Sequence, residues 1–95
     1  GDVLTHALRP NHDKLRRVLC REMGLREPDI DIDRLAFAII GLASIYFHGR
    51  RMVEEISPEL MHGAHIKSAT VDRLTMYAIA LIECERKRRL SARRE

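Results

Sequence analysis

An almost unbroken apolar run, LAFAIIGLASIYF, occupies residues 35–47. Only Gly41 and Ser44 interrupt it. The run is too short to cross a bilayer, which takes roughly 20 apolar residues in a helix. A helix that is apolar on every side has to be buried on every side. Because a chain of 95 residues buries only a limited share of its surface, the run predicts that a partner covers part of it.

Upstream of this run, the apolar spacing predicts a first helix from Asn11 or His12 to Met23. Asn is a favoured N-cap, and Pro10 just before it marks a helix start. The residues before Pro10 are assigned at most to the end of a separate helix. Gly24 is a natural C-terminal stop. One face of the predicted helix has the i, i+3, i+4, i+8 spacing and consists of Leu15, Val18, Leu19 and Met23.

A linker that contains Pro28 follows, because proline disfavours helical backbone in the residue before it. The second helix is expected from about Ile32 to Ile56, with Asp29 or Asp31 as its N-cap. On a helical wheel this helix presents two apolar stripes. The broader stripe is assigned to the chain's own core and comprises Leu35, Ile39, Leu42, Tyr46, Gly49 and Val53. The narrower stripe is assigned to a neighbouring molecule and comprises Ala36, Ile40, Ala43 and Phe47.

The remaining residues predict one short and one long helix. A turn of helix is expected at residues 57–59 (SPE), since Ser suits the N-cap and Pro the first helical position. The long helix is expected from Ser68 or Ala69 to about Arg89, and its main apolar face comprises Val71, Leu74, Tyr77, Ala78, Leu81 and Ile82. No segment alternates apolar and polar residues as a strand does. The predicted fold is an all-α bundle of about three main helices in a single domain, residues 1–95.

Composition and charge refine this picture only slightly. The apolar fraction of 45% and the charged fraction of 33% are typical of a soluble domain. The net charge is +3, and the excess gathers in residues 86–94, RKRRLSARR. We interpret these cations as complements to the dipole at a helix C-terminus, with attraction to nucleic acid or a membrane surface as the alternative. Cys20 and Cys84 are expected to be reduced and packed.

The candidates for catalytic or metal chemistry are weak. His62 and His65 are three residues apart, but a zinc site needs three or four ligands. Glu54 and Glu55 are adjacent, so on a helix their side chains point about 100° apart and cannot work as an acid–base pair. No Ser or Cys stands in a context that would activate it as a nucleophile. We therefore predict no catalytic residue, no metal, no cofactor and no enzymatic activity.

Two segments carry a family resemblance. Residues 33–60 (DRLAFAIIGLASIYFHGRRMVEEISPEL) and 70–89 (TVDRLTMYAIALIECERKRR) resemble the C-terminal half of TetR-family transcriptional regulators. The segment LRRVLCREM at residues 15–23 is similar to the preceding helix in the subgroup to which CecR belongs, which carries a comparable Arg-Glu pair, here Arg21 and Glu22.

The resemblance implies a bacterial, cytoplasmic regulator that forms a homodimer. In that family the last two helices of each subunit form a four-helix interface with a second copy. The helical domain also encloses a pocket for a small effector, expected here to be hydrophobic. The helix-turn-helix module that reads DNA is expected outside this chain, so DNA is a partner only through that module. No membrane partner is expected, because the N-terminal residues lack the form of a signal peptide.

Specific residues follow from this arrangement. The interface between copies is expected to include Ala36, Ile40, Ala43, Phe47, Met76 and Ile79. Ligand contacts are expected from Met23, Tyr46, His48, Met52 and Tyr77, each of which also suits a core or a solvated position. The alternative function is a self-associating helical adaptor with a protein partner and no small ligand. An enclosed apolar cavity favours the regulator, and a solid core with an exposed apolar patch favours the adaptor.

Overall fold

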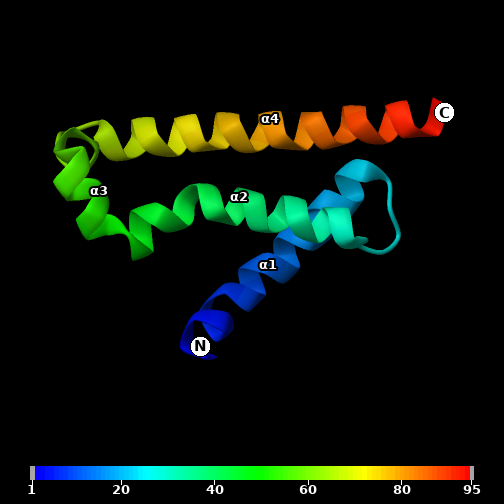
Figure 1. Ribbon diagram of the computed structural model, residues 1–95, viewed down its shortest axis with the longest axis horizontal. Coiled ribbons are helices and arrows are strands. Elements are labelled where there is room, and N and C mark those ends of the chain that lie inside the picture. The colour runs from blue at the N-terminus through cyan, green and yellow to red at the C-terminus, as the bar shows by residue number, and fades with distance from the viewer. Residues whose placement is uncertain (1, 95) are drawn as a thin grey trace.

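The computed structural model describes residues 2–94, without the side chains of residues 2, 4 and 94. Within this range the chain is helical and contains no strand, so the all-α fold class is confirmed. The antiparallel helices α2 and α4 lie side by side, and α1 crosses the beginning of α2 and projects away from the pair (Figure 1). The elements are α1 (Asp2–Met23), α2 (Ile30–His48), α3 (Arg50–Ile56), the 3₁₀ helix η1 (Pro58–Leu60) and α4 (Ile66–Arg94).

The first helix is longer than its sequence predicted. It begins at Asp2, and Pro10 lies inside it, so the expected start at Asn11 or His12 is wrong. A proline removes one backbone hydrogen bond, the one from its own missing N–H, and its ring crowds the carbonyl four residues earlier. Hydrogen bonds on either side of it can still form. The residues before Pro10 therefore belong to the same helix and not to a separate one.

The second helix is shorter than expected because it bends at Gly49. Helix α2 ends at His48 and α3 begins at Arg50, where the sequence predicted one helix to Ile56. The Gly49 N–H still donates to the Ile45 carbonyl at 2.9 Å. A Cβ at Gly49 would lie 2.8 Å from Cδ1 of Ile45, closer than real Cβ atoms approach. Glycine at this position therefore leaves room for the Ile45 side chain at the bend.

The other helix boundaries agree with the sequence more closely. Asp29 is the N-cap of α2, since its Oδ1 accepts a hydrogen bond from the Ile32 N–H at 2.9 Å. The predicted turn after Ser57 is η1, with Pro58 in its first position. Helix α4 is longer than expected at both ends, because it begins at Ile66 and continues past Arg89.

The core lies at one end of the molecule, where the end of α1, the beginning of α2 and the second half of α4 meet. Its buried members are Leu19, Cys20, Met23, Ile32, Leu35 and Ala36, and half-buried Leu15, Leu25, Ile39, Leu81 and Ile82 pack against them. Beyond Ala36, no side chain that the structure describes is fully buried. The other end of the molecule, formed by the end of α2, α3, η1 and the start of α4, thus has no core of its own.

Two expectations about individual side chains need correction. Ala36 was assigned to a neighbouring molecule, but it is 0% exposed within the chain's own core. The helical wheel shows that α2 has two apolar stripes that face different directions. It does not show which stripe contacts α1 and α4. Cys20 is buried as expected, whereas Cys84 is exposed and not packed. Both thiols are free.

Replacement of Leu19 should test the position of the core. Leu19 is completely buried, so Leu19→Ala should lower the free energy of unfolding by about 2–5 kcal/mol through lost apolar contacts and a cavity. Ile56→Ala, at a side chain that is 74% exposed, is the control and should change it by no more than about 0.5 kcal/mol. Urea denaturation followed by circular dichroism measures both. Equal effects of the two substitutions would contradict a core at this end.

Candidate functional site

A cavity of about 310 Å³ lies at the end of the molecule that lacks a core. This volume is within the range of small-molecule sites, about 300–1,000 Å³. Three segments form its walls: the junction of α2 with α3, η1 with the loop after it, and the first turns of α4. The lining residues are Ala43, Tyr46, Phe47, Arg50, Leu60, Met61, Gly63, Ile66, Lys67, Thr70, Val71 and Leu74.

Two glycines shape the chain around this cavity. The bend at Gly49 turns α3 away from the axis of α2 and towards the beginning of α4 (Figure 1), and η1 follows α3 in the chain. Gly63 has a φ of +120°, which side chains of L-residues rarely adopt. A Cβ at Gly63 would also lie 2.9 Å from Cγ1 of Ile66. Both the direction of the loop and its close approach to α4 therefore depend on glycine.

The chemistry of the cavity is mainly apolar. Alanine, leucine, isoleucine, valine, methionine and phenylalanine side chains supply most of its wall. The polar groups among the lining residues are the hydroxyls of Tyr46 and Thr70 and the cationic groups of Arg50 and Lys67. No carboxylate occurs among the lining residues. An apolar cavity with a few polar groups is the usual form of a site for a small organic ligand.

The residues proposed from the sequence as ligand contacts lie in different parts of the molecule. Tyr46 lines the cavity. Met23 lies in the core at the other end, and His48, Met52 and Tyr77 are exposed and do not line the cavity. The sequence missed Ile66 and Lys67 because the helix was predicted to begin two or three residues late, and it assigned Val71 and Leu74 to the main apolar face of that helix. Its first turns carry a row of lining residues at helical spacing, namely Ile66, Lys67, Thr70, Val71 and Leu74.

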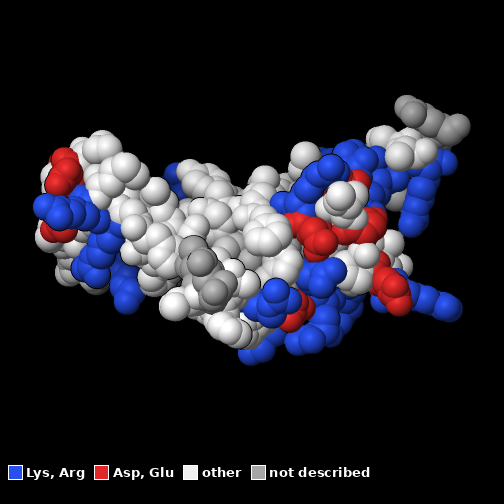
Figure 2. Space-filling model, turned by 60° about the horizontal axis from the view of Figure 1, so that its bottom comes forward, with Lys and Arg blue, Asp and Glu red and all other residues white. Residues whose placement is uncertain are grey.

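Apolar side chains also lie exposed on α2 and α4. Of the residues expected at an interface between copies, Phe47 is 78% exposed, and Met76 and Ile79 are each 56% exposed. Ile40 and Ala43 are half-buried, and Ala36 has no exposed surface. On the face shown in Figure 2, an uncharged surface occupies the middle of the molecule between charged groups at its two ends.

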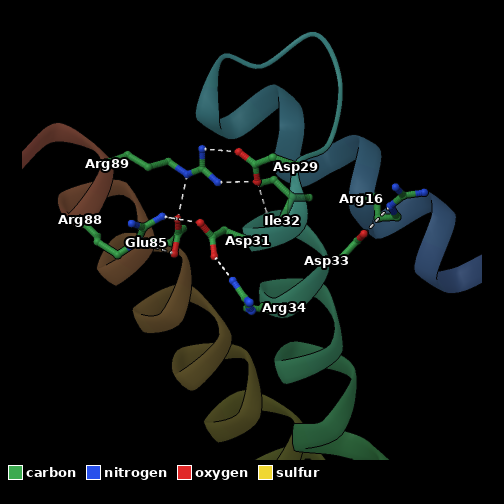
Figure 3. A network of polar contacts seen from close by, with 9 residues as sticks. All are labelled: Arg16, Asp29, Asp31, Ile32, Asp33, Arg34, Glu85, Arg88 and Arg89. Carbon is green, nitrogen blue, oxygen red and sulfur yellow. Dashed lines mark hydrogen bonds and ion pairs between the residues drawn. The ribbon is translucent and has the colours of Figure 1, made fainter. Parts of the chain in front are cut away.

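The charged groups at the core end form a network that joins α2 to α4 (Figure 3). The guanidinium of Arg89 donates to both oxygens of the Asp29 carboxylate, at 3.0 and 2.9 Å. Arg88 donates to Asp31 at 2.9 Å, and both arginines donate to Glu85 at 2.8 Å. Asp29 thus caps α2 and binds α4 with the same carboxylate.

A second set of ion pairs attaches α1 to its neighbours. Nε of Arg16 lies 2.7 Å from Oδ1 of Asp33 on α2 (Figure 3). Arg86 of α4 donates to Glu22 of α1 at 3.1 Å. Three arginines of the basic segment, Arg86, Arg88 and Arg89, are therefore engaged by carboxylates within the chain. The structure gives this segment a role in holding helices together.

The network changes the acidity of its members. Hydrogen bonds from Arg89, and then from the Ile32 N–H, lower the pKa of Asp29 from 3.8 to about 2. The same pairing with Asp29 raises the pKa of Arg89, and Glu85 raises the pKa of Arg88. Both effects favour the charged forms that the ion pairs need. None of these groups lines the cavity between α2 and α4, so we interpret the pKa shifts as structural.

The pKa of Asp29 predicts a loss of stability in acid. Because its pKa is lower in the folded chain, Asp29 stabilises the fold fully above about pH 4, and this contribution disappears as the pH falls towards 2. The half-exposed pair should contribute at most about 1 kcal/mol. Asp29→Asn keeps an N-cap but removes the charge, so its unfolding free energy should fall less between pH 5 and pH 2.

The matched control for this measurement is Asp72→Asn, which removes a carboxylate of α4 outside the network. This variant should unfold with the same pH dependence as the unchanged chain. Denaturant titrations at several pH values give the comparison. A pH dependence that is identical in Asp29→Asn and the unchanged chain would show that the Arg89 pair does not contribute.

The described residues offer little for metal chemistry. No three or more of their His, Cys, Asp or Glu side chains are arranged to hold a metal ion. Nε2 of His62 lies 2.9 Å from Oε1 of Glu54, which ties the loop after η1 to α3. None of the helices in residues 2–94 is long and apolar enough to span a bilayer.

Comparison with known proteins gives one family match. Residues 2–83 match the family model described as the C-terminal domain of the HTH-type transcriptional dual regulator CecR. The matched range contains every residue that lines the cavity. No curated protein and no solved structure matches the chain.

Proposed function

Because the chain belongs to the family of CecR C-terminal domains, which are parts of transcriptional regulators, we propose that it binds a small-molecule effector and joins two copies of its regulator. The observation that carries the proposal is the cavity between α2, η1 and α4. In this view DNA is bound by a helix-turn-helix module outside this chain, in the cytoplasm of a bacterium. Binding of the effector in the cavity changes the binding of DNA by that module.

The position of the cavity supports effector binding. It lies at the end of the molecule where no described side chain is fully buried, so its walls are held by few apolar contacts. A ligand that fills the cavity would supply the apolar contacts that are missing there, and would stabilise the folded chain by mass action. The hydroxyls of Tyr46 and Thr70 would orient it.

Exposed apolar surface on the α2–α4 pair supports association of two copies. Phe47, Met76 and Ile79 are each more than half exposed. Large exposed apolar patches on small soluble domains mark interaction surfaces. Two α2–α4 pairs that pack face to face would form a four-helix interface. With twofold symmetry each patch meets its own copy, so the interface closes at two chains.

One residue connects the two proposed activities. Phe47 lines the cavity and is also 78% exposed to solvent. A second copy that packs on Phe47 would therefore contact one wall of the effector site. If the effector binds one arrangement of the two copies better than another, it shifts the regulator towards that arrangement. The same differential affinity couples effector binding to DNA binding in both directions.

Filling the cavity should abolish ligand binding. N-phenyl-1-naphthylamine, a neutral apolar dye, should bind the chain with an increase in fluorescence. Thr70→Trp places a large side chain in the cavity wall and should weaken this binding at least about tenfold, the effect of losing a few apolar contacts. Ala69→Trp, at the exposed neighbouring position of α4, is the control. Unchanged binding by Thr70→Trp would exclude the cavity as the site and favour an adaptor.

Association of two copies can be tested by analytical ultracentrifugation at micromolar concentration. The chain should sediment as a dimer, and Ile79→Glu should convert it to a monomer, because a charge buried in the interface is costly. Ile79 is 56% exposed in the single chain, so the substitution should leave the helical content unchanged. Ile56→Glu, on α3, serves as the control. A single 11 kDa species for the unchanged chain would contradict the proposal.

A further inference from the structure

We infer that the cavity selects an apolar anion, a molecule with an aliphatic or aromatic body and one acidic head group. The inference rests on the effector-binding role proposed above and specifies the class of effector. Arg50 and Lys67 are the charged residues among those that line the cavity, and both are cations. Each is exposed as a whole, so a ligand in the cavity can be reached by both cations from the solvent side.

Neither cation has a carboxylate partner in the part of the chain that the structure describes. An arginine on a helix can pair with an acid three or four residues away, because the two side chains are then neighbours. Glu54 stands four residues after Arg50, but its Oε1 is engaged by Nε2 of His62 at 2.9 Å. By contrast, the adjacent Arg51 lies 3.6 Å from its own i+4 partner, Glu55. The His62 contact thus occupies the acid that would most easily neutralise Arg50.

The sequence around Lys67 likewise offers no acid at helical spacing. The positions three and four residues before it are Ala64 and Gly63, and those after it are Thr70 and Val71. By contrast, Arg86, Arg88 and Arg89 at the other end of α4 are engaged by Glu22, Asp31 and Asp29. At the cavity the positive charges remain available to a ligand.

The other lining residues suit the apolar body of such a molecule. The apolar lining, which includes Ala43, Leu60 and Leu74, suits a hydrocarbon or aromatic body. Attraction between an acidic head group and the two cations is stronger beside this apolar wall than in open water, because the local dielectric constant is lower. Arginine also binds carboxylate, sulfonate and phosphate oxygens in a bidentate manner. A neutral ligand of the same body would leave both cations without a partner.

The test compares two dyes with the same aromatic body in the full chain. 8-Anilinonaphthalene-1-sulfonate carries a sulfonate, and N-phenyl-1-naphthylamine does not. The anionic dye should bind about tenfold more tightly, the usual advantage of a hydrogen bond to a charged group. Arg50→Met and Lys67→Met should each remove most of this advantage, because they weaken the binding of the anionic dye far more than that of the neutral dye. Competition by decanoate against 1-decanol should show the same preference with an aliphatic body.

Matched controls are Arg73→Met and Lys87→Met, which remove exposed cations of α4 that do not line the cavity. These variants should keep the preference for the anionic dye. Equal affinities for the two dyes, or equal losses in the control variants, would overturn the inference while leaving effector binding intact. If Thr70→Trp leaves the binding of both dyes unchanged, the proposed effector site itself fails. The two failures are therefore distinguishable.

Discussion

The burial of Leu19 and Ile32 where α1, α2 and α4 meet is the constraint on which the rest of the molecule depends. These two side chains are completely buried, and the ion pairs of Asp29 with Arg89 and of Arg16 with Asp33 surround the same junction. Apolar and ionic contacts thus stabilise one end of the α2–α4 pair together. Because the chain is too small to build a second core, the other end stays open, and the cavity lies there.

Much of this architecture follows from local signals in the sequence. The apolar periodicity of the helices, the Asp29 cap and the turn after Ser57 are decided by residues close to one another in the chain, and the structure confirms them. The bend at Gly49 was not predicted from the sequence, and the reason is physical. Helical hydrogen bonds continue on both sides of the bend, so the periodicity shows no break while the direction of the chain changes.

The candidate site depends on tertiary geometry and was therefore only partly predictable. Its walls come from three separate segments, and only Tyr46 among the proposed ligand contacts lines it. A helical wheel shows that α2 has two apolar stripes, but it does not show that Ala36 meets the chain's own core. The lack of an acid partner for Arg50 was equally hidden, because it depends on a contact between Glu54 and His62.

The length and composition of helix α4 have a mechanical consequence. It is 29 residues long and contains neither proline nor glycine, the usual sites of helix kinks. At 1.5 Å per residue it measures about 43 Å and passes from the cavity to the core without a flexible point. A displacement of α4 at the cavity is therefore not absorbed along its length. A tilt of the helix as one rod would therefore move its far end, where Arg88 and Arg89 bind Asp31 and Asp29.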